Sequence, residues 1–250
     1  QSAAQGAWAE MLDSLHRPWA FIHEERLAML AAPTTKAVIL PLCRALTDHE
    51  IQLFSEYAAR GGVLIADIAP GGSDAHGVAR RQPPLDAAFG VQRDIGLGAA
   101  TTGAATWTAS DAPAPGGVSG TVTVDNTVQV STGVPQGNAE SLPIWIRGDH
   151  QPTLLLNHVP RARSAMPDRS DLPVEYHLVD ALLRNNGCPE SIALAKEASF
   201  DGQISCYQLD RARLVLFLAH PQAKEQKFQP IFQEKEVLYD VLAGKRIKKP

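Results

Sequence analysis

Hydrophobic and polar positions in the first thirty residues follow helical and strand patterns in turn. Apolar residues three or four positions apart predict an amphipathic helix over residues 7–15, which Pro18 ends. The run of aromatic and branched residues at 19–23 predicts a short strand, and residues 24–30 predict a helical turn. The chain therefore opens with short elements whose packing partners must come from later segments.

The clearest local pattern is a strand, a helix and a second strand. Residues 36–42 form a continuous apolar run, which is typical of a strand buried on both faces of a parallel sheet. Thr47 and Glu50 have the spacing of a capping box at a helix start, and the glycine pair 61–62 ends that helix. Residues 63–67 are a second buried strand. The pattern predicts a right-handed βαβ unit and hence an α/β fold.

The middle of the chain leaves this pattern and then returns to it. Residues 70–84, rich in Gly and Pro, predict a loop, and residues 85–89 predict a short helix. Residues 91–152 are rich in Thr, Ala, Gly and Val with local alternation, which predicts a β-rich excursion containing hairpin strands at 121–124 and 127–130. A buried strand at 153–158 and a helix at 174–185 then continue the α/β domain, with a polar loop between them.

From residue 191 onward the pattern is all β. Strands are expected at 192–194, 204–209, 213–219 and 237–241. We therefore predict two domains, an α/β domain over residues 1–190 and a small antiparallel β domain over residues 191–250.

Composition narrows the classes of function. Hydrophobic residues make up 44% and charged residues 20% of the 250 residues, as in ordinary globular proteins. A net charge of −4 without long charge runs disfavours a nucleic-acid partner. No apolar run approaches the about 20 residues that a membrane-spanning helix needs, so no membrane partner is expected. The three cysteines, Cys43, Cys188 and Cys206, form neither a disulfide framework nor a zinc motif.

Other sequence features bear on cofactors and on the ends of the chain. The glycines between 96 and 103 do not form a nucleotide-binding fingerprint, and we expect no cofactor. The sequence begins at Gln1 and shows no signal-peptide pattern, so we expect Gln1 to be an internal cut or a processed end. Nothing in the sequence indicates the cellular compartment.

Two stretches resemble the middle and C-terminal domains of family 42 β-galactosidases. The first combines Lys-Ala-Val-Ile-Leu-Pro at 36–41, Leu-Thr-Asp at 46–48 and Gly-Gly-Val-Leu-Ile-Ala-Asp at 61–67. The second is Tyr-Asp-Val-Leu-Ala-Gly-Lys at 239–245. The resemblance implies that the α/β domain is similar to the β-galactosidase trimerisation domain. It also implies a flavodoxin-like parallel sheet of the class I glutamine amidotransferase-like type.

The same resemblance implies a non-catalytic role for this chain. The catalytic barrel of that family, with its two carboxylates, has no counterpart in these 250 residues. We therefore expect an accessory or oligomerisation module of a β-galactosidase-like glycoside hydrolase. Its partners would be further copies of itself or a neighbouring catalytic domain, and the identity of the sugar stays open.

The amidotransferase-like fold places a cysteine nucleophile on a sharp turn after a central strand. The matching turn here follows residues 63–66 and begins with Asp67, so amidotransferase activity is not expected. Asp67 lies at the carboxyl end of a strand, where α/β folds bind ligands. Capping of loop amides is the more common role of such an aspartate, and we favour it.

Two further strand ends carry residues of types that take part in catalysis or ligand binding. Cys43 follows the first strand and would act as a nucleophile if His49 or His158 served as its base. An inert, half-buried thiol is the more common situation and is favoured. Asn157 and His158 follow the strand at 153–156, at the ligand-binding end of a sheet. His158 would face a shared cleft there, but a structural histidine with satisfied hydrogen bonds is favoured.

The remaining candidates are weaker. Asp74 and His76, in the Gly-rich loop, would line a sugar pocket or contribute to a metal site, but a metal needs three or four ligands, so none is expected. Trp107 and Trp145, if exposed, would stack on sugar rings, although core packing is more common. Two alternatives to the module therefore stay open: a stand-alone hydrolase with its site at the strand ends, and a carbohydrate-binding module.

Overall fold

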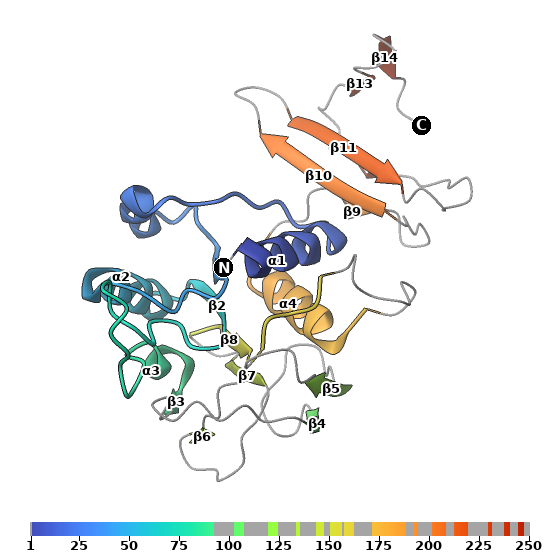
Figure 1. Ribbon diagram of the computed structural model, residues 1–250. Helices are drawn as coiled ribbons and strands as arrows, with labels where there is room; N and C mark the ends of the chain where they lie inside the picture. The colour runs from blue at the N-terminus through green and yellow to red at the C-terminus, as the bar shows by residue number, and fades with distance from the viewer. Residues whose placement is uncertain are drawn as a thin grey trace. The chain divides into compact units, whose positions relative to one another are not determined.

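The computed structural model divides into two compact units, one formed by Gln1–Leu15 and Trp19–Pro189, the other by His16–Pro18 and Glu190–Pro250 (Figure 1). It describes residues 2–91, 151–156, 158–162 and 172–188 in full. It also describes Gln92 and the remaining strands by their backbones. Each unit is considered by itself below.

The first unit is built on a four-stranded sheet with the order β1-β2-β8-β7. Its strands are β1 (Ala37–Leu40), β2 (Val63–Asp67), β8 (Thr153–Leu156) and β7 (Ile144–Arg147). β1, β2 and β8 run parallel, and β7 pairs antiparallel with β8. The predicted α/β fold and its parallel strands are therefore confirmed, with an antiparallel strand closing one edge.

The crossover between β1 and β2 is helix α2 (Asp48–Ala59), and it starts where the sequence indicated. The Thr47 hydroxyl accepts a hydrogen bond from the Glu50 amide at 3.1 Å, and the Glu50 carboxylate accepts one from the Thr47 amide at 2.7 Å. This capping box satisfies two backbone donors at the helix start. Gly61, with φ 87°, ends the helix in the left-handed region that glycine adopts readily.

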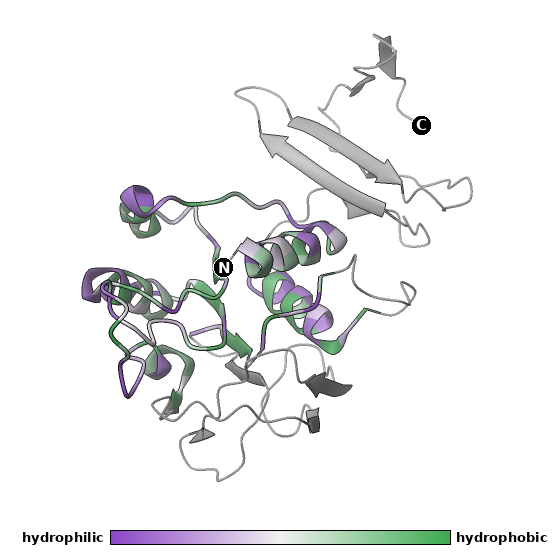
Figure 2. Ribbon diagram, viewed as in Figure 1, coloured by the Kyte–Doolittle hydropathy of each residue, from purple (hydrophilic) through white to green (hydrophobic). Residues whose placement is uncertain are grey.

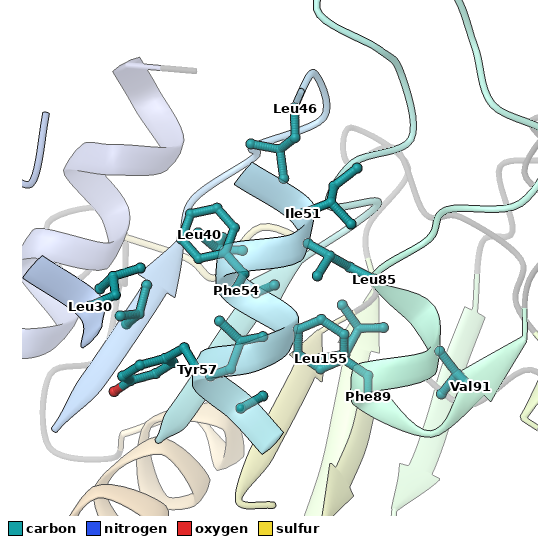
Figure 3. Close-up of a cluster of buried hydrophobic side chains, with 14 residues drawn as sticks. Leu30, Leu40, Leu46, Ile51, Phe54, Tyr57, Leu85, Phe89, Val91 and Leu155 are labelled. Carbon is teal, nitrogen blue, oxygen red and sulfur yellow. The ribbon is translucent and has the colours of Figure 1, made fainter. Parts of the chain in front are cut away.

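Helices cover both faces of the sheet, and their apolar and polar sides are separated (Figure 2). On one face α1 (Ser2–Ser14) and α4 (Val174–Asn185) pack against the sheet around Trp8 and Tyr176. On the other face α2, α3 (Asp86–Phe89) and the 3₁₀ helix η1 (Glu24–Ala31) form a second cluster, which includes Phe54 and Phe89 (Figure 3). Successive residues of β2 contribute alternately to the two clusters, because strand side chains point to opposite faces.

One predicted element is wrong. Residues 19–23 have no regular secondary structure, although their apolar pattern predicted a strand. Trp19 and Phe21 pack edge to face on each other, with ring centroids 5.0 Å apart, and both stay exposed. These rings therefore find a local partner in place of a position in the sheet.

The β-rich excursion contains short antiparallel pairs. β3 (Val91–Gln92) pairs with β6 (Val134–Pro135), and β4 (Gly103–Trp107) pairs with β5 (Gly120–Val124). The hairpin strand predicted at 127–130 lies outside the described residues.

The strands that the structure describes in the second unit also form antiparallel pairs. Its strands are β9 (Ala193–Leu194), β10 (Gly202–Gln208), β11 (Arg213–Ala219), β12 (Pro230–Ile231), β13 (Leu238–Asp240) and β14 (Lys245–Ile247). β10 pairs with β11, β9 with β12, and β13 with β14.

Among the helices that the structure describes, none has the length and apolarity to cross a membrane.

Candidate functional site

The carboxyl ends of β2 and β8 bring ionisable side chains together. Asp67 is the last residue of β2 and is paired in register with Leu156, the last residue of β8. His158 follows two positions later on the chain. The sheet therefore brings two of the residues singled out in the sequence, Asp67 and His158, to one edge, as expected for parallel strands.

Asp67 is completely buried and holds two elements to this edge. Its Oδ2 accepts a hydrogen bond from Trp8 Nε1 of α1 at 2.7 Å, and its Oδ1 accepts one from the Leu42 amide at 2.5 Å. Burial raises the pKa of Asp67 to about 6, although the Trp8 and Leu42 bonds and the nearby His158 act to lower it. The expected role in binding loop amides is present, and the Trp8 contact adds a link to α1.

The turns that follow β1 and β2 have unusual backbones. Leu42 has φ 48° and Ile68 has φ 51°, a left-handed conformation that is uncommon outside glycine and strained for a β-branched residue. The turn at Leu42 accompanies the hydrogen bond from its amide to Asp67. The Ile68 amide donates to the Leu156 carbonyl at 2.7 Å. Both turns therefore direct backbone amides to this edge of the sheet.

His158 and Glu175 form the second half of the cluster. They are 5% and 6% exposed, and His158 Nε2 lies 3.8 Å from Glu175 Oε1. Within the described part of the chain, neither ring nitrogen of His158 has a hydrogen-bond partner. Glu175 lies in the first turn of α4, where the helix dipole favours a negative charge.

Cys43 lies close to this cluster in an environment that keeps its thiol protonated. The Sγ donates to the Pro41 carbonyl at 3.6 Å. Burial, helped by the charges of Asp67 and Glu50, raises the pKa of the Cys43 thiol to about 12. The candidate base His49 is exposed on α2. The two charges that act on the thiol, those of Asp67 and Glu50, are negative and disfavour the thiolate that a nucleophile needs.

The loop candidates are used by the loop itself. The Asp74 carboxylate accepts hydrogen bonds from the amides of His76 and Val78, both at 2.9 Å, and these bonds lower its pKa. Arg80 donates to the carbonyls of Leu46, Gly71 and Ser73 and so fixes the loop against the start of α2. In the described ranges no group of three His, Cys, Asp or Glu side chains could hold a metal ion.

Three sequence candidates cannot be placed. Asn157 lies outside the described residues, and so do the side chains of Trp107 and Trp145. Conversely, two members of the cluster were not recognised as site residues from the sequence. In the sequence, Trp8 fits the apolar face of the first helix and gives no sign of a site. Glu175 belongs to no motif, and its one signal is a carboxylate in the first turn of a predicted helix.

The arrangement of elements has counterparts among solved structures. A catalytic mutant of Gan42B, a GH42 beta-galactosidase from G. stearothermophilus, matches with a TM-score of 0.53 and 15% identity, over 97% of this chain and 33% of that chain. The beta-galactosidase from Bacillus circulans sp. alkalophilus matches with a TM-score of 0.56 and 13% identity, over 86% of this chain and 31% of that chain. The fold is GH42-related. A scan against protein-family models and a search of the curated proteins returned no match.

This chain spans about a third of the length of the two beta-galactosidase chains. At these identities the similarity concerns the fold, and it does not transfer individual residues. The chemistry of the buried cluster of Asp67, His158, Glu175 and Trp8 therefore follows from its own contacts. Those contacts offer a carboxylate, an imidazole and a second carboxylate in a closed, apolar setting.

Proposed function

We propose that this chain is a non-catalytic accessory and oligomerisation module of a β-galactosidase-like glycoside hydrolase. The observation that carries the proposal is the pattern of coverage. Two GH42 beta-galactosidases match 97% and 86% of this chain, whereas only 33% and 31% of their own lengths are matched. A fold that accounts for a third of such an enzyme is what an accessory region would provide.

The chemistry at the carboxyl edge of the sheet supports a non-catalytic role. In a sheet of the glutamine amidotransferase-like type, the turn after the central strand would carry the nucleophile. Here that turn contains Asp67 and Ile68. Asp67 is completely buried and accepts hydrogen bonds from the Trp8 indole and the Leu42 amide. Burial raises the pKa of the Cys43 thiol to about 12, which disfavours the thiolate that a nucleophile needs. A stand-alone hydrolase at the strand ends is therefore disfavoured.

Exposed apolar side chains support a role in assembly. Trp19, Phe21 and Met29 are among the large hydrophobic residues that remain exposed, and all three lie between residues 19 and 29. Phe21 is 69% exposed. Trp19 and Phe21 contact each other, and contiguous exposed apolar surface is typical of interaction sites when it is large. The partner in this proposal is another copy of the chain or an adjacent catalytic domain.

The decisive experiment is to measure the size and activity of the native polypeptide. An antibody raised against this chain is used for immunoblotting of source cells, and the precipitated protein is assayed with a chromogenic β-galactoside. We expect a polypeptide far larger than 26.9 kDa that brings galactoside-hydrolysing activity with it. Pre-immune serum provides the control. A product near 26.9 kDa, or a large product without activity, would overturn the proposal.

A further inference from the structure

The sheet of the first unit has one edge that none of the described strands covers. Its order is β1-β2-β8-β7, so β7 forms one edge and β1 the other. The Val63 amide of β2 donates to the Lys36 carbonyl at 3.1 Å, and the parallel register then continues along β1. Because backbone groups alternate in direction along a strand, the amides and carbonyls of Ala37 and Ile39 point away from β2. Such an edge is a template for pairing with another strand.

The side chains of β1 differ in burial from those of β2. Ile39 and Ile65 are register partners and face the same cluster, yet Ile65 is completely buried and Ile39 only partly. Ile65 lies between two neighbouring strands, whereas Ile39 has a described strand on one side only. A strand laid along the open edge would cover Ile39 and pair with the outward backbone groups of β1.

The helices indicate on which side of β1 the earlier segments belong. α2 connects β1 to β2 on the face of the second cluster. Since crossovers between parallel strands are right-handed, every such connection on that face leads in the same direction across the sheet. η1 lies on that face and leads into β1, so a strand formed by residues 19–23 would lie beyond the open edge. In Figure 3, Leu30 of η1 lies on the β1 side of the cluster, away from Leu155 of β8.

α1 lies on the opposite face, where the same rule reverses the direction. A strand that leads through α1 to residues 19–23 would therefore lie between those residues and β1. Residues 19–23 themselves have no regular secondary structure, although Ile22 packs against the second cluster. The charge of the amino terminus acts on Asp67, so α1 begins near the carboxyl edge of the sheet, where a strand parallel to β1 would end.

We propose that the open edge of β1 binds a further parallel strand, an apolar segment of the polypeptide that directly precedes Gln1, and that this strand separates β1 from residues 19–23. α1 covers one face of this strand and η1 the other, which favours a continuous run of Val, Ile and Leu. The inference rests on the proposed function, in which this chain is one region of a longer polypeptide. The two GH42 beta-galactosidases, of which this chain spans about a third, have the length for such a segment.

Hydrogen exchange of the native polypeptide tests this strand. The protein is isolated with the antibody described above, and mass spectrometry reads the exchange residue by residue. We expect the amides of Ala37 and Ile39 to exchange about a hundredfold more slowly in it than in the 250-residue chain, because only there do they donate to a neighbouring strand. The amides of Val38 and Leu40, which point toward β2 in both, are the matched control. Fast exchange of Ala37 and Ile39 in the native polypeptide would overturn the proposal.

A second measurement identifies the source of the strand. The about ten residues that precede Gln1, sequenced from the native polypeptide, are added to the 250-residue chain. We expect this extension to slow the exchange of Ala37 and Ile39 at every protein concentration. A matched extension with proline at its centre should leave both amides fast, because proline has no amide donor and does not fit a central strand. An extension without effect, or protection that needs no extension and grows with concentration, as a second copy would give, contradicts the proposed strand.

The size of the native polypeptide separates this strand from the proposed function. A native polypeptide near 26.9 kDa overturns the proposed function and the strand with it. A far larger polypeptide that hydrolyses galactosides, but in which Ala37 and Ile39 exchange fast, overturns the strand alone.

Discussion

The hydrogen bond from Trp8 to Asp67 joins residues 59 positions apart and connects the N-terminal helix to the sheet edge. Replacing Trp8 with Phe keeps an aromatic ring but removes the donor. The buried Asp67 carboxyl then has one partner fewer, and we expect the free energy of unfolding to fall by about 2 kcal/mol. Urea unfolding at pH 7 measures this change.

Two comparisons separate the bond from the lost ring volume. Trp19→Phe removes a similar bond, to Asp13 at 3.0 Å, but in an exposed position, and should cost under about 1 kcal/mol. In an Asp67→Ala background, which removes the acceptor, the cost of Trp8→Phe should shrink, because the two groups interact directly. An unchanged cost in that background would mean that Trp8 acts through packing alone.

Cys43 offers a test at the level of a single thiol. Because burial raises its pKa to about 12, almost no thiolate exists at pH 7. In a chain carrying Cys188→Ser and Cys206→Ser, iodoacetamide should modify Cys43 far more slowly than it modifies free cysteine. The rate should recover in 8 M urea at about the value of the free thiol. Rapid modification of the folded chain would restore Cys43 as a nucleophile candidate.

At the scale of elements, the βαβ unit shows how local signals and packing agree. The capping box, the glycine pair and both strands occur where the pattern predicted them. The strand predicted at 19–23 was wrong because an apolar run specifies burial and leaves the partner open. In the fold, Trp19 and Phe21 contact each other. Whether such a run joins a sheet depends on strands far away in the sequence.

Gly62 provides a prediction at the end of α2. A Cβ on Gly62 would collide with the ring of Tyr57, and that ring is held by a hydrogen bond from its hydroxyl to the Thr35 carbonyl at 3.3 Å. Gly62→Ala should therefore destabilise the fold by about 1–3 kcal/mol, as overpacking does. Thermal and urea unfolding would measure it.

Gly6 is the matched control within a helix. Nothing lies within 4 Å of a Cβ built on Gly6, which is an interior residue of α1. Gly6→Ala should stabilise the chain by about 0.5–1 kcal/mol through helix propensity. Equal effects of the two substitutions would contradict the close approach of Tyr57 to Gly62.

At the scale of the whole molecule, the proposed role in assembly predicts a defined mass. Light scattering behind size exclusion should give a multiple of 26.9 kDa for this chain. Phe21→Ser should shift the mass toward 26.9 kDa, because Phe21 is the most exposed of the grouped apolar residues. Val78→Ser, in the loop fixed by Arg80, is the control and should leave the mass unchanged. A monomer of the natural sequence at micromolar concentration would contradict self-association.

Sequence alone determined the α/β class, the order of β1, α2 and β2, and the presence of Asp67 and His158 at strand ends. Those features depend on hydrophobic period, caps and glycines, which act over a few residues. The resemblance to family 42 β-galactosidases also came from short motifs, and two solved structures share the fold.

Only the tertiary structure decided what these strand ends do. Trp8 and Glu175 reach Asp67 and His158 because α1 and α4 lie on one face of the sheet, and helix periodicity does not specify the neighbour of an apolar face. Burial likewise raises the pKa values of Asp67 and Cys43, and burial is a property of the packed core. The chemistry of this edge therefore follows from contacts between distant segments, which local sequence patterns do not encode.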